Sequence, residues 1–265
     1  MLKSLGYQLY ACGRNGLPGQ IIFENNKYRF CEIFKHDFFA ATALYEFDSR
    51  PQATEIPNPA RIILKLSRQQ HFLGLPLAWL GGFLCCHEVS ILRQLSHLRG
   101  IPRFLSHYGG TGFIYEYIEG CSLDKEKKLP DDFFDKLLEL LRKVHRRDIV
   151  YLDMDKRSNI LLGSDRQPHL VDFQISLHIG EHLLIWRRLS GYLRDALQRA
   201  DIYHIFKHKR RLCPQFLRPE EQALSRRISG LIWLHRLAAT PLRNLRRNLL
   251  KFLDTKGLTA TKKST

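Results

Sequence analysis

The sequence predicts an α+β protein of two lobes, a small β-rich N-terminal lobe with one main helix and a reduced helical C-terminal lobe. Up to residue 118, aromatic and β-branched residues alternate in short runs, as they do in half-buried strands. Beyond residue 130, apolar residues recur at helical spacing. With 265 residues, 44% hydrophobic and 26% charged, the chain can bury a substantial core.

The N-terminal lobe is expected to span residues 28–118, after an extension formed by residues 1–27. In the extension, the glycine-rich segment Cys12–Gly19 lacks the Lys-Ser or Lys-Thr ending of a phosphate loop, which favours a surface turn. Five strands are predicted, and the first three form an antiparallel meander with Pro51–Pro59 as a connection. They are Tyr28–Phe34, Leu44–Phe47, Ile62–Leu66, Ile101–Leu105 and Gly112–Ile118.

Two charged residues of this lobe stand out by position. Lys65 lies inside the third predicted strand, where a lysine most often points into solvent. Glu88 lies near the expected start of an amphipathic helix over Glu88–Leu98, where a carboxylate favours the helix dipole. Both residues therefore also have a purely structural explanation.

The C-terminal lobe is expected to span residues 119–215, with the boundary between the lobes at Glu119–Leu123. Pro130 and the two aspartates after it are a strong helix start, and an apolar face continues to Arg147. This predicted helix leads directly into the most polar part of the lobe.

The stretch Val150–Ser176 gathers polar residues that suit a hydrophobic core poorly. They are Asp153, Asp155, Asn159 and Asp172. Two apolar runs, Ile160–Leu162 and His169–Val171, are joined by a Gly-Ser-Asp turn and predict a hairpin. Oxygen ligands that converge at the end of a hairpin suit a divalent cation, although each acid alone is more simply explained as a solvated loop residue.

Basic residues accumulate toward the C-terminus. From Ile175 onward there are 19 Lys or Arg against 6 Asp or Glu, so most of the net charge of +16 lies there. Helices are predicted at Trp186–Arg199, Asp201–Arg211, Glu220–Ala239 and Pro241–Leu253. Residues 216–265 are expected to form basic C-terminal helices and, from Thr255, a disordered tail.

The basic clusters Lys207–Arg211 and Arg243–Arg247 have two explanations. They are either solvated faces of packed helices or a surface for anionic lipid, lipopolysaccharide phosphates or RNA. Sequence-specific recognition of nucleic acid is not expected, because no base-reading motif or aromatic stacking platform occurs.

The six cysteines show no CxxC spacing, which indicates reduced thiols in a cytosolic protein, with zinc binding as the lesser alternative. The N-terminus lacks the features of a signal peptide. The longest uncharged run, Phe72–Cys86, has 15 residues and is interrupted by glycines and a proline, whereas a bilayer span needs about 20. The expected location is the cytoplasm. The basic helices leave open a second location, peripheral attachment to the inner membrane surface.

The order of these features resembles the protein kinase superfamily over Tyr28–Ser176. A strand lysine, a helix glutamate, a linker and a helix are followed by an Asp and Asn pair and an Asp-Phe motif. The compact chain is similar to the RIO, lipopolysaccharide-kinase and aminoglycoside-phosphotransferase branches. The resemblance implies a two-lobed protein kinase-like fold, ATP and Mg²⁺ as ligands, and transfer of the γ-phosphoryl group to a hydroxyl.

For the N-terminal lobe, the resemblance implies that Lys65 contacts the α and β phosphates of ATP and pairs with Glu88. It also implies that the linker binds adenine through backbone groups. The linker residues concerned are Glu116, Tyr117 and Ile118.

For the C-terminal lobe, the resemblance implies that Asp153 is the base that accepts the proton of the substrate hydroxyl. Lys156 would neutralise the transferring phosphoryl group. Asn159 and Asp172 would hold magnesium.

The spacing of the motif departs from that of the family. Asn159 follows Asp153 by six residues, whereas the HRDxxxxN motif has five. Either the loop contains one inserted residue or Asp155 takes part of the role. Tyr151, which stands where the histidine of the motif would be, favours Asp153.

Other departures favour a second interpretation, a nucleotide-binding pseudokinase. The segment Lys35–Leu44 contains no glycine, Gln174 replaces the glycine of the DFG motif, and no APE motif follows. Retention of every polar site residue favours an enzyme instead. As acceptor, protein Ser or Thr is expected because most of the superfamily uses it, and a membrane saccharide suits the small C-terminal lobe equally well. A third interpretation is a membrane or RNA adaptor that acts through the basic helices.

Overall fold

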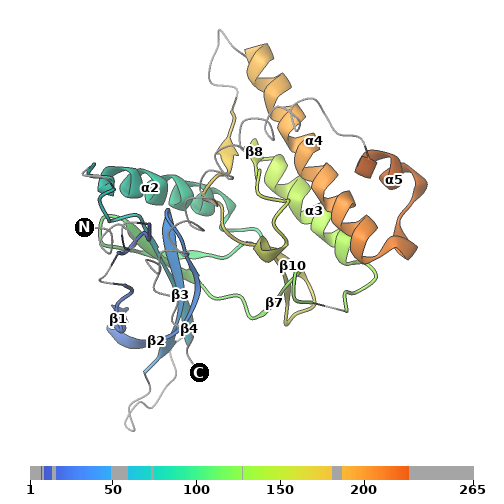
Figure 1. Ribbon diagram of the computed structural model, residues 1–265. Helices are drawn as coiled ribbons and strands as arrows, with labels where there is room; N and C mark the ends of the chain where they lie inside the picture. Colours follow the sequence, from blue (N-terminus) through green and yellow to red (C-terminus); the bar gives the residue numbers. More distant parts are fainter. Residues whose placement is uncertain are drawn as a thin grey trace, which may run out of the picture. The chain divides into compact units, whose positions relative to one another are not determined.

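The computed structural model describes residues 7, 9–13, 16–48, 59–72, 75–126, 128–180 and 187–226. In this described part, an antiparallel sheet and four α-helices confirm the predicted α+β class (Figure 1). The chain forms two compact units. Described residues of the first unit lie within 1–89 and 103–117, and those of the second lie within 90–102 and 118–226.

The first unit is built on a six-stranded antiparallel sheet in the order β1-β2-β3-β4-β6-β5. The strands are β1 (Gln20–Phe23), β2 (Asn26–His36), β3 (Ala40–Phe47), β4 (Arg61–Ser67), β5 (Phe104–Tyr108) and β6 (Gly112–Glu116). The predicted meander is confirmed, because β2, β3 and β4 pair in sequence. The sequence does not predict β1, since its four residues are too few to display an alternating pattern.

One face of this sheet is covered by the N-terminal extension. Alternate residues of β4, including Ile62 and Leu64, share a core with Ala11 and Cys12. Cys12 is 1% exposed, so the prediction of a surface turn over Cys12–Gly19 is wrong at its first residue. Burial raises the pKa of the Cys12 thiol to about 11, which makes this cysteine a structural residue rather than a reactive one.

Helix α2 (Ala78–Leu95) begins well before the predicted start at Glu88, which lies in the middle of the helix instead. The sequence misleads here because Gly81 and Gly82 look like helix breakers. Gly81 has a packing role: a Cβ added at this position would lie 1.9 Å from the carbonyl oxygen of Arg68. Only glycine therefore lets α2 approach the end of β4 so closely.

The second unit combines three helices with short strand pairs. They are α3 (Phe133–His145), α4 (Arg187–Leu212), α5 (Pro219–Arg226), β7 (Gly120–Ser122), β8 (Ile149–Val150), β9 (Ile160–Gly163), β10 (Pro168–Leu170) and β11 (Leu177–His178). The predicted hairpin is confirmed as β9 and β10, and β8 pairs with β11 (Figure 1). These strands hold the polar stretch between them.

Helix α4 runs without interruption, so the predicted break before Asp201 is wrong. An aspartate at this position resembles a helix start, but the Asp201 carboxylate instead accepts hydrogen bonds from backbone amides outside the helix. The predicted helix Glu220–Ala239 is described only as far as Arg226. The predicted helix Pro241–Leu253, the tail from Thr255 and nearly all of Pro51–Pro59 lie outside the described residues.

All six cysteines are free, as predicted. Over the described ranges, none of the helices is both long and apolar enough to cross a membrane.

Candidate active site

Lys65 and Glu88 form a buried ion pair in the first unit. The ammonium nitrogen of Lys65 lies 2.8 Å from both carboxylate oxygens of Glu88, and the two side chains are 2% and 3% exposed. The register of the sheet places Lys65 beside Thr42 of β3 and Phe113 of β6. Lys65 therefore does not point into solvent, and its partner is the glutamate that the resemblance implies.

The turn between β2 and β3 closes without glycine. One carboxylate oxygen of Asp37 accepts hydrogen bonds from the backbone amides of Phe39 and Ala40, at 2.8 and 3.1 Å. The guanidinium of Arg68 stacks on the ring of Phe38 at 3.7 Å and donates to its carbonyl oxygen at 2.8 Å. Two backbone amides that a phosphate loop would offer are thus already bound by a carboxylate.

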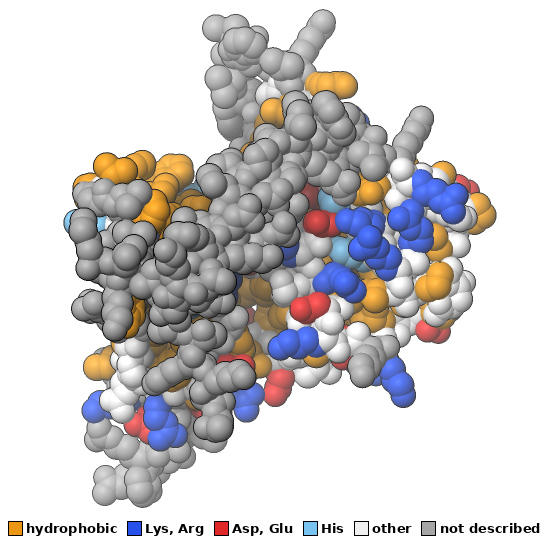
Figure 2. Space-filling view, in the orientation of Figure 1, with side chains coloured by type: hydrophobic (Ala, Val, Ile, Leu, Met, Phe, Trp, Pro, Cys, Tyr) orange, Lys and Arg blue, Asp and Glu red, His pale blue; other side chains and the backbone are white. Residues whose placement is uncertain are grey.

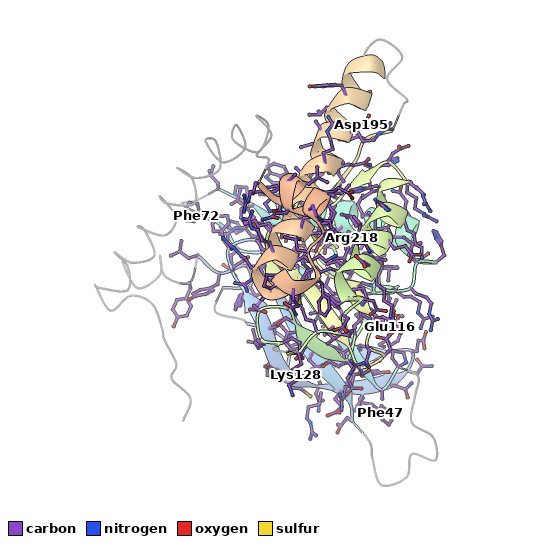
Figure 3. All side chains as sticks on the ribbon, turned by 90° about the vertical axis from the view of Figure 1, so that its right-hand side faces the viewer. Phe47, Phe72, Glu116, Lys128, Asp195 and Arg218 are labelled. Atoms are coloured by element: carbon purple, nitrogen blue, oxygen red, sulfur yellow. The ribbon has the colours of Figure 1, made fainter. Side chains whose placement is uncertain are left out.

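The expected adenine linker begins at the end of the sheet. Glu116, labelled in Figure 3, is the last residue of β6. Tyr117 lies 6.3 Å from the ring of Phe34 in a stacked arrangement, and the guanidinium of Arg61 lies 5.9 Å from the centroid of the Tyr117 ring. Ile118, which is half-buried, begins the second unit. The sequence did not single out Phe34, which belongs to an exposed part of β2.

Asp153 is the centre of the polar stretch in the second unit. It is 7% exposed, and its Oδ2 accepts hydrogen bonds from Lys156 Nζ and Asn159 Nδ2, each at 2.7 Å. Lys156 itself is about half exposed, so its ammonium group lies at the edge of this cluster. Three of the predicted site residues are therefore in direct contact.

Asp155 faces a different partner. Its Oδ1 lies 2.5 Å from Lys207 Nζ and 3.1 Å from His204 Nδ1, both on α4. Hydrogen bonding from His204 and the positive charge of Lys207 hold the pKa of Asp155 well below its usual range. Asp155 ties the loop to α4, which leaves Asp153 as the carboxylate of the polar cluster.

Asp172 lies two residues after the end of β10 and has a φ of 63°. This left-handed conformation is uncommon for an aspartate and costs on the order of 1 kcal/mol. Two contacts hold the chain in place before it: the Val171 amide donates to the Asn159 carbonyl at 3.0 Å, and the Tyr151 hydroxyl donates to the Val171 carbonyl. The backbone of Asp172 is thereby fixed next to that of Asn159.

The donor chemistry of Asn159 and Asp172 fits a divalent cation. Asn159 uses Nδ2 to bind Asp153, while its Oδ1 accepts a long hydrogen bond from the Ser158 hydroxyl, at 3.4 Å. Amide and carboxylate oxygens are hard ligands of the kind that Mg²⁺ prefers. Within the described ranges no group of three or more His, Cys, Asp or Glu could hold a metal ion, so Asn159 and Asp172 could supply at most part of a ligand set. Mg²⁺ typically completes such a set with water and substrate phosphates.

Asp201, on α4, is the site residue that the sequence did not reveal. Its carboxylate is 1% exposed and accepts hydrogen bonds from the backbone amides of Tyr151 and Leu152, at 2.8 and 2.9 Å. The Nε2 of His145 lies 3.1 Å from Oδ2 of the same carboxylate. Leu152 has a φ of 64°, so Asp201 stabilises an uncommon backbone conformation just before Asp153.

The burial of His208 predicts that the stability of this unit depends on pH. The imidazole is 2% exposed, and Nε2 donates to the Met154 carbonyl at 2.9 Å. Burial lowers the pKa of His208 from 6.5 to about 4. As the pH falls, the unfolded chain takes up this proton first, so we expect up to about 3 kcal/mol of stability to be lost between pH 6.5 and 4.

Urea unfolding at about pH 7 and about pH 5 measures this loss. His208→Gln keeps a donor near the Met154 carbonyl but does not titrate. We expect the free energy of unfolding of this variant to change clearly less between the two pH values than that of the unmodified protein. Equal slopes for the two proteins would show that His208 is not the titrating group.

Comparison with protein-family models gives no match to this chain, and comparison with curated proteins gives none either. Function therefore has to be inferred from the residues and their geometry.

Proposed function

We propose that this protein is an ATP-dependent phosphotransferase with a two-lobed protein kinase-like fold, which transfers the γ-phosphoryl group of ATP to a hydroxyl. The observation that carries the proposal is the buried carboxylate of Asp153, bound through Oδ2 by both Lys156 and Asn159. Phosphoryl transfer requires a base near the hydroxyl and positive charge near the phosphates. A single loop supplies groups suited to both requirements.

In the second unit, Asp153 accepts the proton of the acceptor hydroxyl on its carboxylate. Lys156, whose Nζ is 2.7 Å from Asp153 Oδ2, supplies positive charge to the phosphoryl group as it moves. Asn159 and Asp172 would hold Mg²⁺, which neutralises phosphate charge when it is bound. Asp201 positions the loop by binding its backbone amides.

In the first unit, Lys65 contacts the phosphates of ATP, and Glu88 holds the ammonium group in place. The residues of β4 alternate in direction, so Arg61 and Lys65 lie on one face, four residues or ~13 Å apart. Arg61 packs on Tyr117, which stacks with Phe34. This face therefore carries a cation at one end and an aromatic pair at the other, an arrangement that suits a nucleoside phosphate.

The test is transfer of label from γ-labelled ATP in the presence of Mg²⁺. We expect Asp153→Asn to lower the rate by about a hundredfold or more, because the amide cannot accept the proton, while nucleotide binding is retained. Asp155→Asn is the matched control, because Asp155 binds α4 and has no role in the chemistry. Loss of transfer in Asp155→Asn together with full activity in Asp153→Asn would contradict the assignment.

The acceptor is either a protein Ser or Thr or a membrane saccharide such as a lipopolysaccharide core. Label transfer to a lysate divided into protein, lipid and saccharide fractions separates these acceptors. We expect one fraction to take the label in a manner that depends on Asp153.

A nucleotide-binding pseudokinase is the second candidate function. It is favoured by the turn between β2 and β3, where Asp37 accepts hydrogen bonds from the backbone amides of Phe39 and Ala40. A carboxylate in that position competes with nucleotide phosphates for the same donors. Nucleotide binding with no label transfer to any fraction would establish this candidate.

A further inference from the structure

Helix α2 and the residues before it carry three large apolar side chains that remain exposed. Leu75, Trp79 and Phe83 are 61%, 69% and 63% exposed. Trp79 and Phe83 are four residues apart in α2 and lie along one side of the helix, and Leu75 lies three residues before the helix begins. Figure 2 shows hydrophobic side chains gathered over the region of α2. We call Leu75, Trp79 and Phe83 the α2 apolar stripe.

The rest of the helix fixes the direction in which this stripe faces. Gly81, Cys85 and Glu88 are buried on the side of α2 that meets the sheet, and Gly81 contacts the Arg68 carbonyl. Trp79 and Phe83 lie on the opposite side. Leu75 is held in position by two backbone hydrogen bonds with Phe72, at 2.9 and 3.0 Å. The stripe is therefore a surface built on ordered backbone.

The composition of this region suits transfer out of water. No charged residue occurs from Phe72 to Cys86 in the sequence, so the segment that carries the stripe has no charge of its own that would be removed from solvent. A contiguous apolar patch of this kind marks an interaction surface more often than a monomer surface. Tryptophan and phenylalanine are also the residue types that enter the interfacial region of a bilayer.

Charge selects the partner. Around the stripe, the sequence from Arg68 to Arg103 contains four arginines and a single acidic residue, Glu88, so this region repels a second copy of itself, whereas an anionic lipid surface attracts it. We propose that the α2 apolar stripe inserts into the interface of a membrane that contains anionic phospholipid. This inference does not depend on the proposed phosphotransferase activity, and it concerns a surface other than the basic C-terminal helices.

The experiment uses the full-length chain and vesicles of phosphatidylcholine with or without phosphatidylglycerol. Trp79 becomes the only tryptophan when Trp186 and Trp233 are both replaced by phenylalanine. We expect its emission to shift to the blue on vesicles with phosphatidylglycerol and to be quenched by brominated acyl chains. Catalysis is not needed for this readout.

Co-sedimentation with the same vesicles provides the matched comparison. We expect Trp79→Gln and Phe83→Gln each to weaken vesicle binding about tenfold, because each removes a large apolar group from the interface. Ile22→Gln is the control, since Ile22 is 66% exposed in the same unit but lies on β1. Its vesicle binding should equal that of the unmodified protein.

Three results would overturn the proposal. If vesicle binding is unchanged in the stripe variants but lost in high salt, the basic segments alone are responsible for membrane binding. Trp79 that is already shielded from an aqueous quencher without vesicles would show that another part of the chain or a second copy covers the stripe. If the protein does not bind vesicles at all, lipid is not the partner of the α2 apolar stripe, and a protein partner becomes the explanation for this exposed surface.

Discussion

Replacing Lys65 with methionine will lower the free energy of unfolding by about 3–5 kcal/mol and abolish nucleotide binding. The first effect follows from burial, because Lys65 and Glu88 are 2% and 3% exposed and the variant leaves the Glu88 carboxylate without its cation. The second follows from the proposed contact of Lys65 with the phosphates. Urea unfolding measures the first effect, and titration with a fluorescent ATP analogue measures the second.

The double variant Lys65→Met/Glu88→Leu separates the two effects. Replacing both members of a buried ion pair with apolar groups is often close to neutral, so we expect most of the lost stability to return. Nucleotide binding should remain absent. If the double variant binds ATP like the unmodified protein, Lys65 does not contact the phosphates, and the nucleotide assignment fails for this unit.

Replacing Asp201 with alanine will destabilise the second unit by about 3–5 kcal/mol, since each buried donor left without a partner costs about 1–3 kcal/mol. The amides of Tyr151 and Leu152 lose their acceptor, and the uncommon backbone conformation of Leu152 loses its support. We expect transfer activity to fall with stability, because Asp153 follows directly in the chain.

Asp201→Asn is the matched control, because it keeps the size of the side chain and one acceptor oxygen. We expect an intermediate loss of stability, because the side-chain NH₂ group of the new asparagine would face a backbone amide that is itself a donor. Hydrogen exchange at the Tyr151 and Leu152 amides measures the local effect, and urea unfolding measures the global one. Unchanged exchange at both amides in Asp201→Ala would contradict the anchoring role.

Local pattern was sufficient to predict much of the fold. The meander of β2, β3 and β4 and the hairpin of β9 and β10 have strong alternation and clear turns, and the structure has both. Helix α3 likewise has a strong apolar face between clear start and end signals. The contact of Asp153 with Lys156 and Asn159 also joins residues that are close in sequence.

The errors arose where tertiary packing overrides local preference. Gly81 looks like a helix breaker, yet it lies inside α2 because the Arg68 backbone occupies the space of a side chain. Asp201 looks like a helix start, yet it is a buried acceptor in the middle of α4. One signal was available: Asp201 shares a helical face with the buried residues Ile205 and His208, where a solvated aspartate would not be expected.

The hydrogen bond between the Tyr151 amide and Asp201 joins residues 50 positions apart. Closing so long a loop costs entropy before any contact compensates for it. During synthesis, the segment that carries Asp153 therefore stays unsupported until α4 has been made and has docked. Order in the polar stretch is a property of the completed chain, so the ability to act on a substrate would arise only after this unit has folded.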